Sequence, residues 1–171
     1  AVAPYKEKGD LVQQSDFLSS ILWKGKSFTV SVRTLDGAHY PFYGEWKVEP
    51  SLHANGPSLK MEDLESEPSI ILDKSFLLKG VQVGDVVRLG FSDLKVKSFL
   101  VDEPQTVAGS FALGPRVLLH RKWGIQSGLM GRGSRVFNQL LIKTDENTEE
   151  FTKNFRAKAP DPHWRLITPE H

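Results

Sequence analysis

Two neighbouring segments that alternate apolar and polar side chains constrain the fold of this chain most strongly. They are residues 81–90, Val-Gln-Val-Gly-Asp-Val-Val-Arg-Leu-Gly, and residues 94–101, Leu-Lys-Val-Lys-Ser-Phe-Leu-Val. A period of two places successive side chains on opposite faces of a strand, whereas a helical face repeats every 3.6 residues. The pattern therefore predicts a turn and two strands in a small barrel or compact sheet.

Other segments with strand-like patterns lie on both sides of this pair. Residues 17–23 and 28–35 read as two strands, joined by a candidate hairpin turn at Lys24-Gly25-Lys26. Shorter apolar runs at 70–72, 117–119 and 135–143 predict three more. A bend rather than a strand is expected at 40–44, because its proline cannot donate a ladder hydrogen bond.

Helical signals are few and short. We expect a surface excursion over 50–68 with a short helix near 59–64, and a helical turn over 74–78 capped by Gly80. Four glycines between 124 and 133 predict a flexible loop. The run Asn147-Thr148-Glu149-Glu150 is typical of a helix start, and Phe151 and Phe155 would share one face of that helix. A final strand at 164–167 would complete a βαβ-like unit.

The predicted fold class is α+β. The chain has 171 residues, of which 39% are apolar and 10% aromatic, enough for one core or two small subdomains. We expect residues 1–46 and 137–171 to form an α+β part, and residues 47–136 to form an inserted β-rich part.

The chain lacks the common motifs of catalysis. It has no cysteine, which excludes disulfides, thiolate metal sites and cysteine nucleophiles. It also has no Gly-x-Ser-x-Gly elbow, no phosphate-binding loop and no zinc-binding helix, and its five histidines are scattered. We therefore predict no catalytic residue, no bound cofactor and no metal. A hydrolase with an acidic site around Asp102-Glu103 is the lowest-ranked alternative.

Overall charge does not identify a partner, but one segment is locally basic. Lys plus Arg (22) nearly balance Asp plus Glu (21). Residues 115–143 nevertheless hold six basic residues and no acidic one. The alternative function is therefore a small β-barrel nucleic-acid-binding module that uses this segment, with Trp123 for stacking. Charges on alternate strand faces and a mobile loop are the competing interpretation.

No stretch approaches the roughly 20 apolar residues that cross a bilayer, and the first residues contain no signal-peptide core. As given, the chain is predicted to be soluble, and its lack of an initiator methionine fits either processing or excision from a larger protein.

Aromatic and basic side chains supply the candidate partner-binding residues, because aromatics dominate interface hot spots. Burial between the two parts of the chain is the competing interpretation for the aromatic group. The candidates are Tyr40, Phe42, Tyr43, Trp46, Arg121, Lys122, Trp123, Arg132 and Arg135.

An ordered set of short motifs resembles a known family. These motifs are residues 81–90, Asp102-Glu103-Pro104, Phe111-Ala112-Leu113-Gly114-Pro115-Arg116-Val117-Leu118-Leu119 and Gly133-Ser134-Arg135-Val136, preceded by Tyr40-Pro41-Phe42-Tyr43-Gly44. Together they resemble the extracytoplasmic domain of FtsX-like, MacB-type ABC transporter permeases, and the YbbP-like branch in particular. The resemblance covers residues 17–143.

The resemblance implies a domain between two membrane helices, with a porter-like part built from both chain ends and a β-rich insertion. It implies a non-enzymatic role at the periplasmic face of the bacterial inner membrane, where the domain would be anchored by transmembrane helices. Hydrolysis of ATP by a separate cytoplasmic ABC subunit would drive a conformational change, delivered to an extracytoplasmic protein or a lipid or lipoprotein substrate. A permease dimer is expected in the intact protein, and nucleic acid is not an expected partner.

Overall fold

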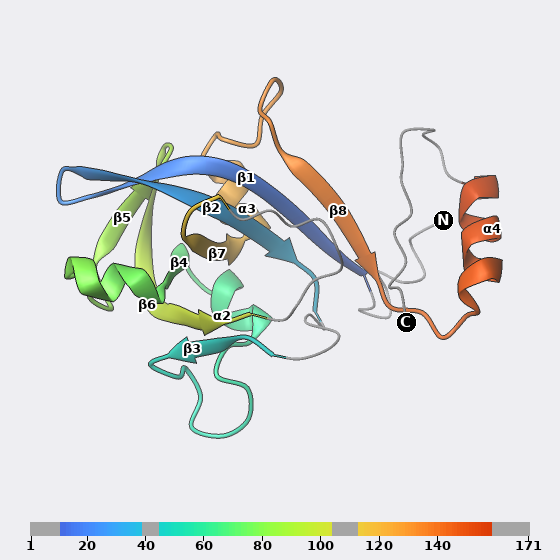
Figure 1. Ribbon diagram of the computed structural model, residues 1–171, viewed down its shortest axis with the longest axis horizontal. Helices are drawn as coiled ribbons and strands as arrows, with labels where there is room; N and C mark the ends of the chain where they lie inside the picture. Colours follow the sequence, from blue (N-terminus) through green and yellow to red (C-terminus); the bar gives the residue numbers. More distant parts are fainter. Residues whose placement is uncertain (1–10, 39–44, 104–112, 159–171) are drawn as a thin grey trace.

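Six strands pair in a closed circuit. The computed structural model describes residues 11–38, 45–103 and 113–158. The circuit runs through β1 (Leu11–Trp23), β2 (Lys26–Asp36), β7 (Arg116–His120), β4 (Ser69–Asp73), β6 (Ser92–Asp102) and β5 (Val86–Leu89), which pairs back with β1 (Figure 1). β3 (Lys47–Glu49) adds to β6, and β8 (Phe137–Ile142) adds to β1. The chain is thus a mixed α/β structure in which the sheet dominates.

The β1–β2 hairpin forms as its turn sequence predicts. Lys24 and Gly25 both have positive φ, 45° and 75°, the geometry that matches a two-residue turn to the twist of its strands. β1 begins at Leu11, earlier than predicted, because its first half also pairs with β8.

Side chains of the barrel strands alternate between two cores. In β4, Ile70 and Leu72 belong to the interior core, whereas Ile71 belongs to an outer one. In β7, Leu118 is likewise outer. Strands buried on both faces read as continuous apolar runs, which is why 70–72 and 117–119 show no alternation.

The excursion between β3 and β4 covers the outer core. It contributes Leu59, Met61 and Leu64, which pack with Val48 of β3 and with Trp46 just before β3, and all five are buried. The short helix α2 (Met61–Glu65) lies within it, as predicted. Its start is fixed by the Asp63 carboxylate, which accepts from the Lys60 N–H at 2.7 Å and contacts His53 Nε2 at 2.8 Å.

The predicted helical turn after β4 is a 3₁₀ helix, η1 (Lys74–Lys79). Asp73 caps it by accepting from the Ser75 N–H at 2.9 Å, and Gly80 ends it at φ 92°. The Gly80 cap is confirmed, whereas the Asp73 cap was not predicted.

The prediction of a flexible glycine loop is wrong over Arg121–Gln126, which forms helix α3. His120 Nδ1 accepts from the Lys122 N–H at 3.1 Å and caps this helix. A Cβ at Gly124 would lie 2.6 Å from Thr34 Cγ2, so this glycine serves close packing against β2 rather than flexibility.

Helix α4 (Thr148–Lys158) follows β8 and stands apart from the barrel in Figure 1. As predicted, Asn147 Oδ1 accepts from the Glu149 N–H at 2.9 Å, and the rings of Phe151 and Phe155 stack at 6.0 Å. The strand predicted at 164–167 lies outside the described residues.

β1 joins the segments that we assigned to different parts. It pairs with β2 along one edge, and with β8 and then β5 along the other. β1 and β2 come from segment 1–46, yet they close the barrel with strands of segment 47–136. The division into 1–46 with 137–171 and an inserted 47–136 stays a prediction.

Candidate partner-binding surface

Helix α3 places two of the basic candidates differently. Arg121 is half-buried, and its Nη1 donates to Ser15 Oγ at 2.6 Å. Ser15 in turn donates to Asn138 Oδ1 of β8 at 2.6 Å. Lys122 is exposed, with its Nζ 4.9 Å from the centre of the Trp123 ring. Of this pair, Lys122 offers its side chain to solvent, whereas Arg121 ties α3 to β1.

Both predicted tryptophan anchors are core residues. Trp123 is 7% exposed, and its Nε1 donates to the Leu64 carbonyl at 2.8 Å. Trp46 is 1% exposed and belongs to the outer core. Closure of the barrel and its covering excursion bury these rings, so neither presents a surface for a partner or for base stacking.

Arg132 and Arg135 lie in the exposed loop between α3 and β8. Arg132 lies within a turn that is closed by a hydrogen bond from the Ser134 N–H to the Gly131 carbonyl at 3.1 Å, and Arg135 follows this turn. Gly128 and Gly133 have φ of 78° and 85°, so the predicted glycine-rich loop does occur here, after α3. Tyr40, Phe42 and Tyr43 lie outside the described residues.

The basic segment 115–143 does not form one patch. Arg116 is 7% exposed and lies on the barrel wall, where its Nε contacts Glu103 Oε1 at 3.2 Å and its Nη1 donates to Ser31 Oγ at 3.1 Å. With Arg116 and Arg121 engaged in the fold and Trp123 buried, a continuous basic and aromatic track for a nucleic-acid strand is lacking in the described part of the segment. The nucleic-acid alternative is therefore not favoured.

A four-membered ion network was missed by sequence reasoning. Arg33, 1% exposed, donates to both oxygens of Asp16 at 2.8 and 3.0 Å, and its Nη1 lies 3.5 Å from Glu103 Oε2. Arg116 contacts both acids as well. Counting the hairpin register outward from Lys24-Gly25 would have placed Asp16 opposite Arg33, so the signal was available.

This network also bears on the acidic-site alternative. Glu103 shares two arginines with Asp16, and each of its carboxylate oxygens contacts one guanidinium group. This carboxylate is therefore part of the ion network of the barrel wall. Among the described residues, no cluster of three or more histidine and acidic side chains could hold a metal ion.

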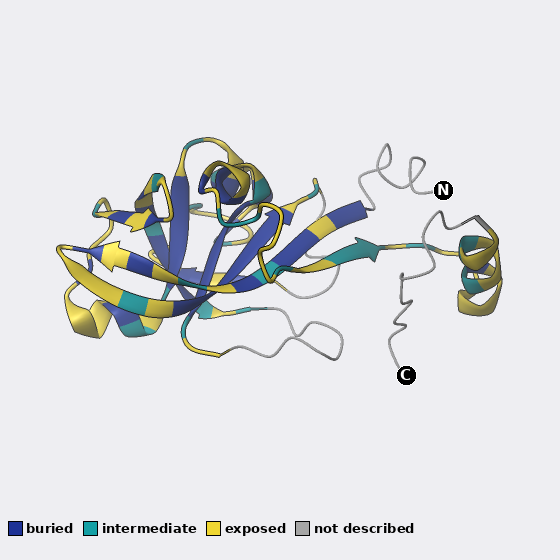
Figure 2. Ribbon diagram, turned by 90° about the horizontal axis from the view of Figure 1, so that it is seen from above, coloured by how far each residue is buried: buried dark blue, intermediate teal, exposed yellow. Residues whose placement is uncertain are grey.

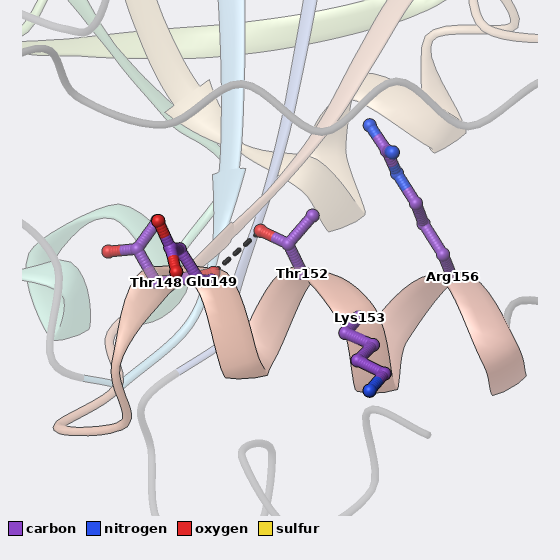
Figure 3. A pocket seen from close by; sticks show the side chains of 5 residues that line it. All are labelled: Thr148, Glu149, Thr152, Lys153 and Arg156. Atoms are coloured by element: carbon purple, nitrogen blue, oxygen red, sulfur yellow. Dashed lines mark hydrogen bonds between the residues drawn. The ribbon is translucent and has the colours of Figure 1, made fainter.

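A shallow hollow lies along helix α4 and is lined by Thr148, Glu149, Thr152, Lys153 and Arg156 (Figure 3). Thr152 Oγ1 donates to the Thr148 carbonyl at 2.6 Å, and the Lys153 and Arg156 side chains diverge. One exposed helix supplies all five residues, so the hollow does not have converging polar groups as a ligand site does.

Comparison with known proteins adds evidence at the level of the fold. No protein-family model matches the sequence, and no curated protein matches it significantly. Several solved structures are similar to it, and three of them are described below. One is the periplasmic region of MacB from Actinobacillus actinomycetemcomitans, with a TM-score of 0.51 and 15% sequence identity. The match covers 84% of this chain and 62% of the MacB region.

The other two structures cover more of their own length. A domain of a predicted permease from Porphyromonas gingivalis has a TM-score of 0.55 at 13% identity, covering 92% of this chain and 68% of its own. The extracellular domain of the noncanonic ABC-type transporter YknZ from Gram-positive bacteria has a TM-score of 0.54 at 12% identity, covering 84% and 68%.

These likenesses define the fold of the chain. It has the fold of the extracytoplasmic domains of MacB-like ABC transporter permeases, as the sequence resemblance predicted. The chain spans about 62% of the MacB region that it matches. No helix of the described residues is long and apolar enough to cross a membrane.

Proposed function

We propose that the chain is the extracytoplasmic domain of an ABC transporter permease of the FtsX-like type. The observation that carries the proposal is the agreement of two independent comparisons. Ordered motifs between Tyr40 and Val136 resemble this family, and the fold matches three domains of ABC-type transporters or a predicted permease. The domain acts at the outer face of the bacterial inner membrane, held by transmembrane helices of its parent protein.

In this role the domain is a non-catalytic transmitter of movement. A cytoplasmic ABC ATPase hydrolyses ATP, and the resulting change in the paired permeases reaches the domain through their membrane helices. Two features support mechanical rather than chemical work. The Glu103 carboxylate is held by arginines, and β1 is hydrogen-bonded to three neighbouring strands.

We further propose that residues 1–46 and 137–171 build the porter-like part and that residues 47–136 are the β-rich insertion. The pairing of β1 with β8 supports this division, because it brings residues 11–16 beside residues 137–142. In this arrangement β1 and β2 belong to the porter-like part and also pair with strands of the insertion.

An extracytoplasmic protein, or a lipid or lipoprotein substrate, would meet the exposed basic residues of the α3–β8 region. Among the candidates that lie in the described part of the chain, Lys122, Arg132 and Arg135 are the exposed ones. Arg121 would act indirectly, because its contact with Ser15 links α3 to β1.

Cysteine labelling of the full-length parent protein in intact cells tests this proposal, since the domain contributes no cysteine of its own. Leu78→Cys places the thiol at an exposed position, because Leu78 is 93% exposed. Val87→Cys places it at a fully buried position. A membrane-impermeant maleimide should label the first without permeabilisation and leave the second unlabelled. Labelling of Leu78→Cys only after permeabilisation would overturn the location.

The coupling is tested in the same cells. Labelling of Arg132→Cys should change in rate when the partner ATPase carries a hydrolysis-blocking substitution, while Leu78→Cys serves as the matched exposed control. If the labelling rate of Arg132→Cys were the same with the active and the blocked ATPase, the proposed transmission of movement to this loop would be wrong.

A further inference from the structure

The outer surface of the barrel differs between its two sides. Over β4, β6 and β7 the outer apolar residues, including Ile71, Leu100 and Leu118, are buried beneath the excursion between β3 and β4. Along β5 and the second half of β1, exposed residues alternate with buried or half-buried ones, whereas β8 has only exposed and half-buried residues (Figure 2). A sheet face that meets water is normally polar.

This wall carries four exposed apolar side chains on one face. Leu18 is 53% exposed, Leu22 44%, Val86 58% and Phe137 55%. Phe137 pairs with Asp16, two residues before Leu18, and Leu22 pairs with Arg88, two residues after Val86. Paired residues and residues two apart share a face, so the four side chains form a stripe along β1.

Small side chains leave this apolar stripe uncovered. Ser20 lies between Leu18 and Leu22 and is exposed, and its partner on β2 is Thr29. Neither residue has the long charged side chain that commonly protects an exposed sheet surface. Exposed apolar residues grouped on one face of a sheet mark an interaction site more often than singly scattered leucines do.

The charges beside the stripe are mainly positive. Arg88 is opposite Leu22, Lys95 is opposite Val86, and Lys24 and Lys26 stand at the hairpin end, all exposed. Asp93 faces Arg88 across β5 and β6 and is the exposed acid among these paired positions. At the Phe137 end of the stripe, Asp16 is ion-paired with Arg33. A chain of net charge +1 thus carries a local excess of cations here.

We propose that this stripe, formed by Leu18, Leu22, Val86 and Phe137 and flanked by Arg88 and Lys95, docks an acidic amphipathic segment of a partner protein. Apolar residues of that segment would cover the stripe, and its carboxylates would meet the flanking cations. A second copy of this chain is a poorer occupant, because its own stripe has no excess of carboxylates to meet the cations. The inference concerns a surface separate from the α3–β8 loop and does not rest on the transporter role.

Binding of designed peptides to the 171-residue chain tests the docking surface. One fluorescent peptide alternates leucine with glutamate, and its charge-reversed partner alternates leucine with lysine. We expect the acidic peptide to bind at least 10-fold more tightly than the basic one. We also expect weaker binding at high salt, because screening acts on exposed ion pairs. Equal affinities for the two peptides would overturn the proposal.

Substitutions locate the site. Leu18→Ser with Leu22→Ser should weaken binding of the acidic peptide at least 10-fold, and Arg88→Ser should weaken it and reduce its salt dependence. Leu78→Ser is the matched control, because it removes an exposed leucine from η1, an element that contributes no residue to the stripe. A loss of affinity as large with Leu78→Ser would contradict the assignment.

The other occupants give distinct results. If analytical sedimentation showed a dimer of the wild-type chain, and Leu22→Ser abolished that dimer, self-association would replace the proposal. Binding to phosphatidylglycerol vesicles that needs Leu18 and Leu22, without binding of the acidic peptide, would replace it with a lipid surface. Because all the substituted side chains are exposed, unchanged thermal unfolding of each variant separates lost docking from lost folding.

Discussion

At the scale of single residues, Asp85 is a turn residue whose carboxylate is held by hydrogen bonds from two other residues. Its carboxylate accepts from the Gln82 N–H at 3.0 Å and from Trp23 Nε1 at 3.1 Å. The Gln82 hydrogen bond, followed by the Trp23 bond and nearby Lys24, lowers the pKa of Asp85 below its ordinary value against an opposing effect of burial. The ionised form therefore ties the β5 entry to the hairpin end.

This predicts a pH-dependent contribution to stability. A pKa lower in the folded than in the unfolded chain stabilises the fold above about pH 4, and that contribution is lost as pH falls through the folded-state value. Urea unfolding between pH 7 and pH 2 should show a steeper loss of stability in the wild type than in Asp85→Asn. Parallel curves would show that Asp85 contributes nothing.

Gly25 is the second residue whose role follows from local geometry. Its φ of 75° is unfavourable for any residue with a Cβ, although a Cβ there would touch nothing within 4 Å. Gly25→Ala should therefore destabilise the chain by about 1 kcal/mol through backbone strain alone.

Gly131→Ala is the matched control for this effect. Gly131 does not have positive φ, and a Cβ there would come no closer than 3.9 Å to another atom. Thermal unfolding should separate the two variants, and equal melting temperatures would contradict the argument from the turn.

At the scale of elements, helix α3 depends on a cap that composition does not reveal. His120 Nδ1 accepts from the Lys122 N–H, so its hydrogen must lie on Nε2, which faces Asp36 Oδ1 at 3.5 Å. One imidazole therefore caps the helix and joins it to the end of β2.

Removing that cap should destabilise the chain by about 1 kcal/mol or more. We expect His120→Ala to lower the midpoint of urea unfolding, and His120→Asn to recover most of the loss because its amide oxygen can accept the same N–H bond. If asparagine were no better than alanine, packing of the imidazole rather than capping would be its contribution.

At the scale of the whole molecule, stability rests on two cores that share strands β4 and β7. Ile71 and Leu72 are adjacent and both fully buried, but they belong to different cores. The excursion that supplies the outer core is therefore structural, although its composition resembles a surface loop.

Alanine substitution tests whether the two cores are equivalent. Ile71→Ala and Leu72→Ala should each cost about 2–4 kcal/mol, because each leaves a cavity. Leu78→Ala, at a 93% exposed position, should change the free energy of unfolding by less than about 0.5 kcal/mol. Calorimetry should show one transition for each variant; a small effect at Ile71 alone would mean that the outer core forms separately.

Much of the local structure could be predicted, because its causes lie within a few residues. The hairpin at Lys24-Gly25, the caps at Gly80 and Asn147 and the alternation in β6 each depend on neighbours in sequence. Helix α3 could not be predicted, because Gly124 reads as a loop former until Thr34 packs against it.

The candidate surface was predicted less well than the fold. Exposure of Arg132 and Arg135 follows from their glycine-rich loop, whereas burial of Trp46 and Trp123 depends on elements far away in sequence. The sequence by itself determined most of the strands, the hairpin and the caps at Gly80 and Asn147, since short-range sterics and hydrogen bonding set these features; β3 was not predicted. Only the tertiary structure decided that β2 pairs with β7, 85 positions along the chain at Ser31 and Arg116, and so closes the barrel. That closure decides which side chains face a core, an ion network or the uncovered stripe, because burial depends on contacts between segments that no local pattern encodes.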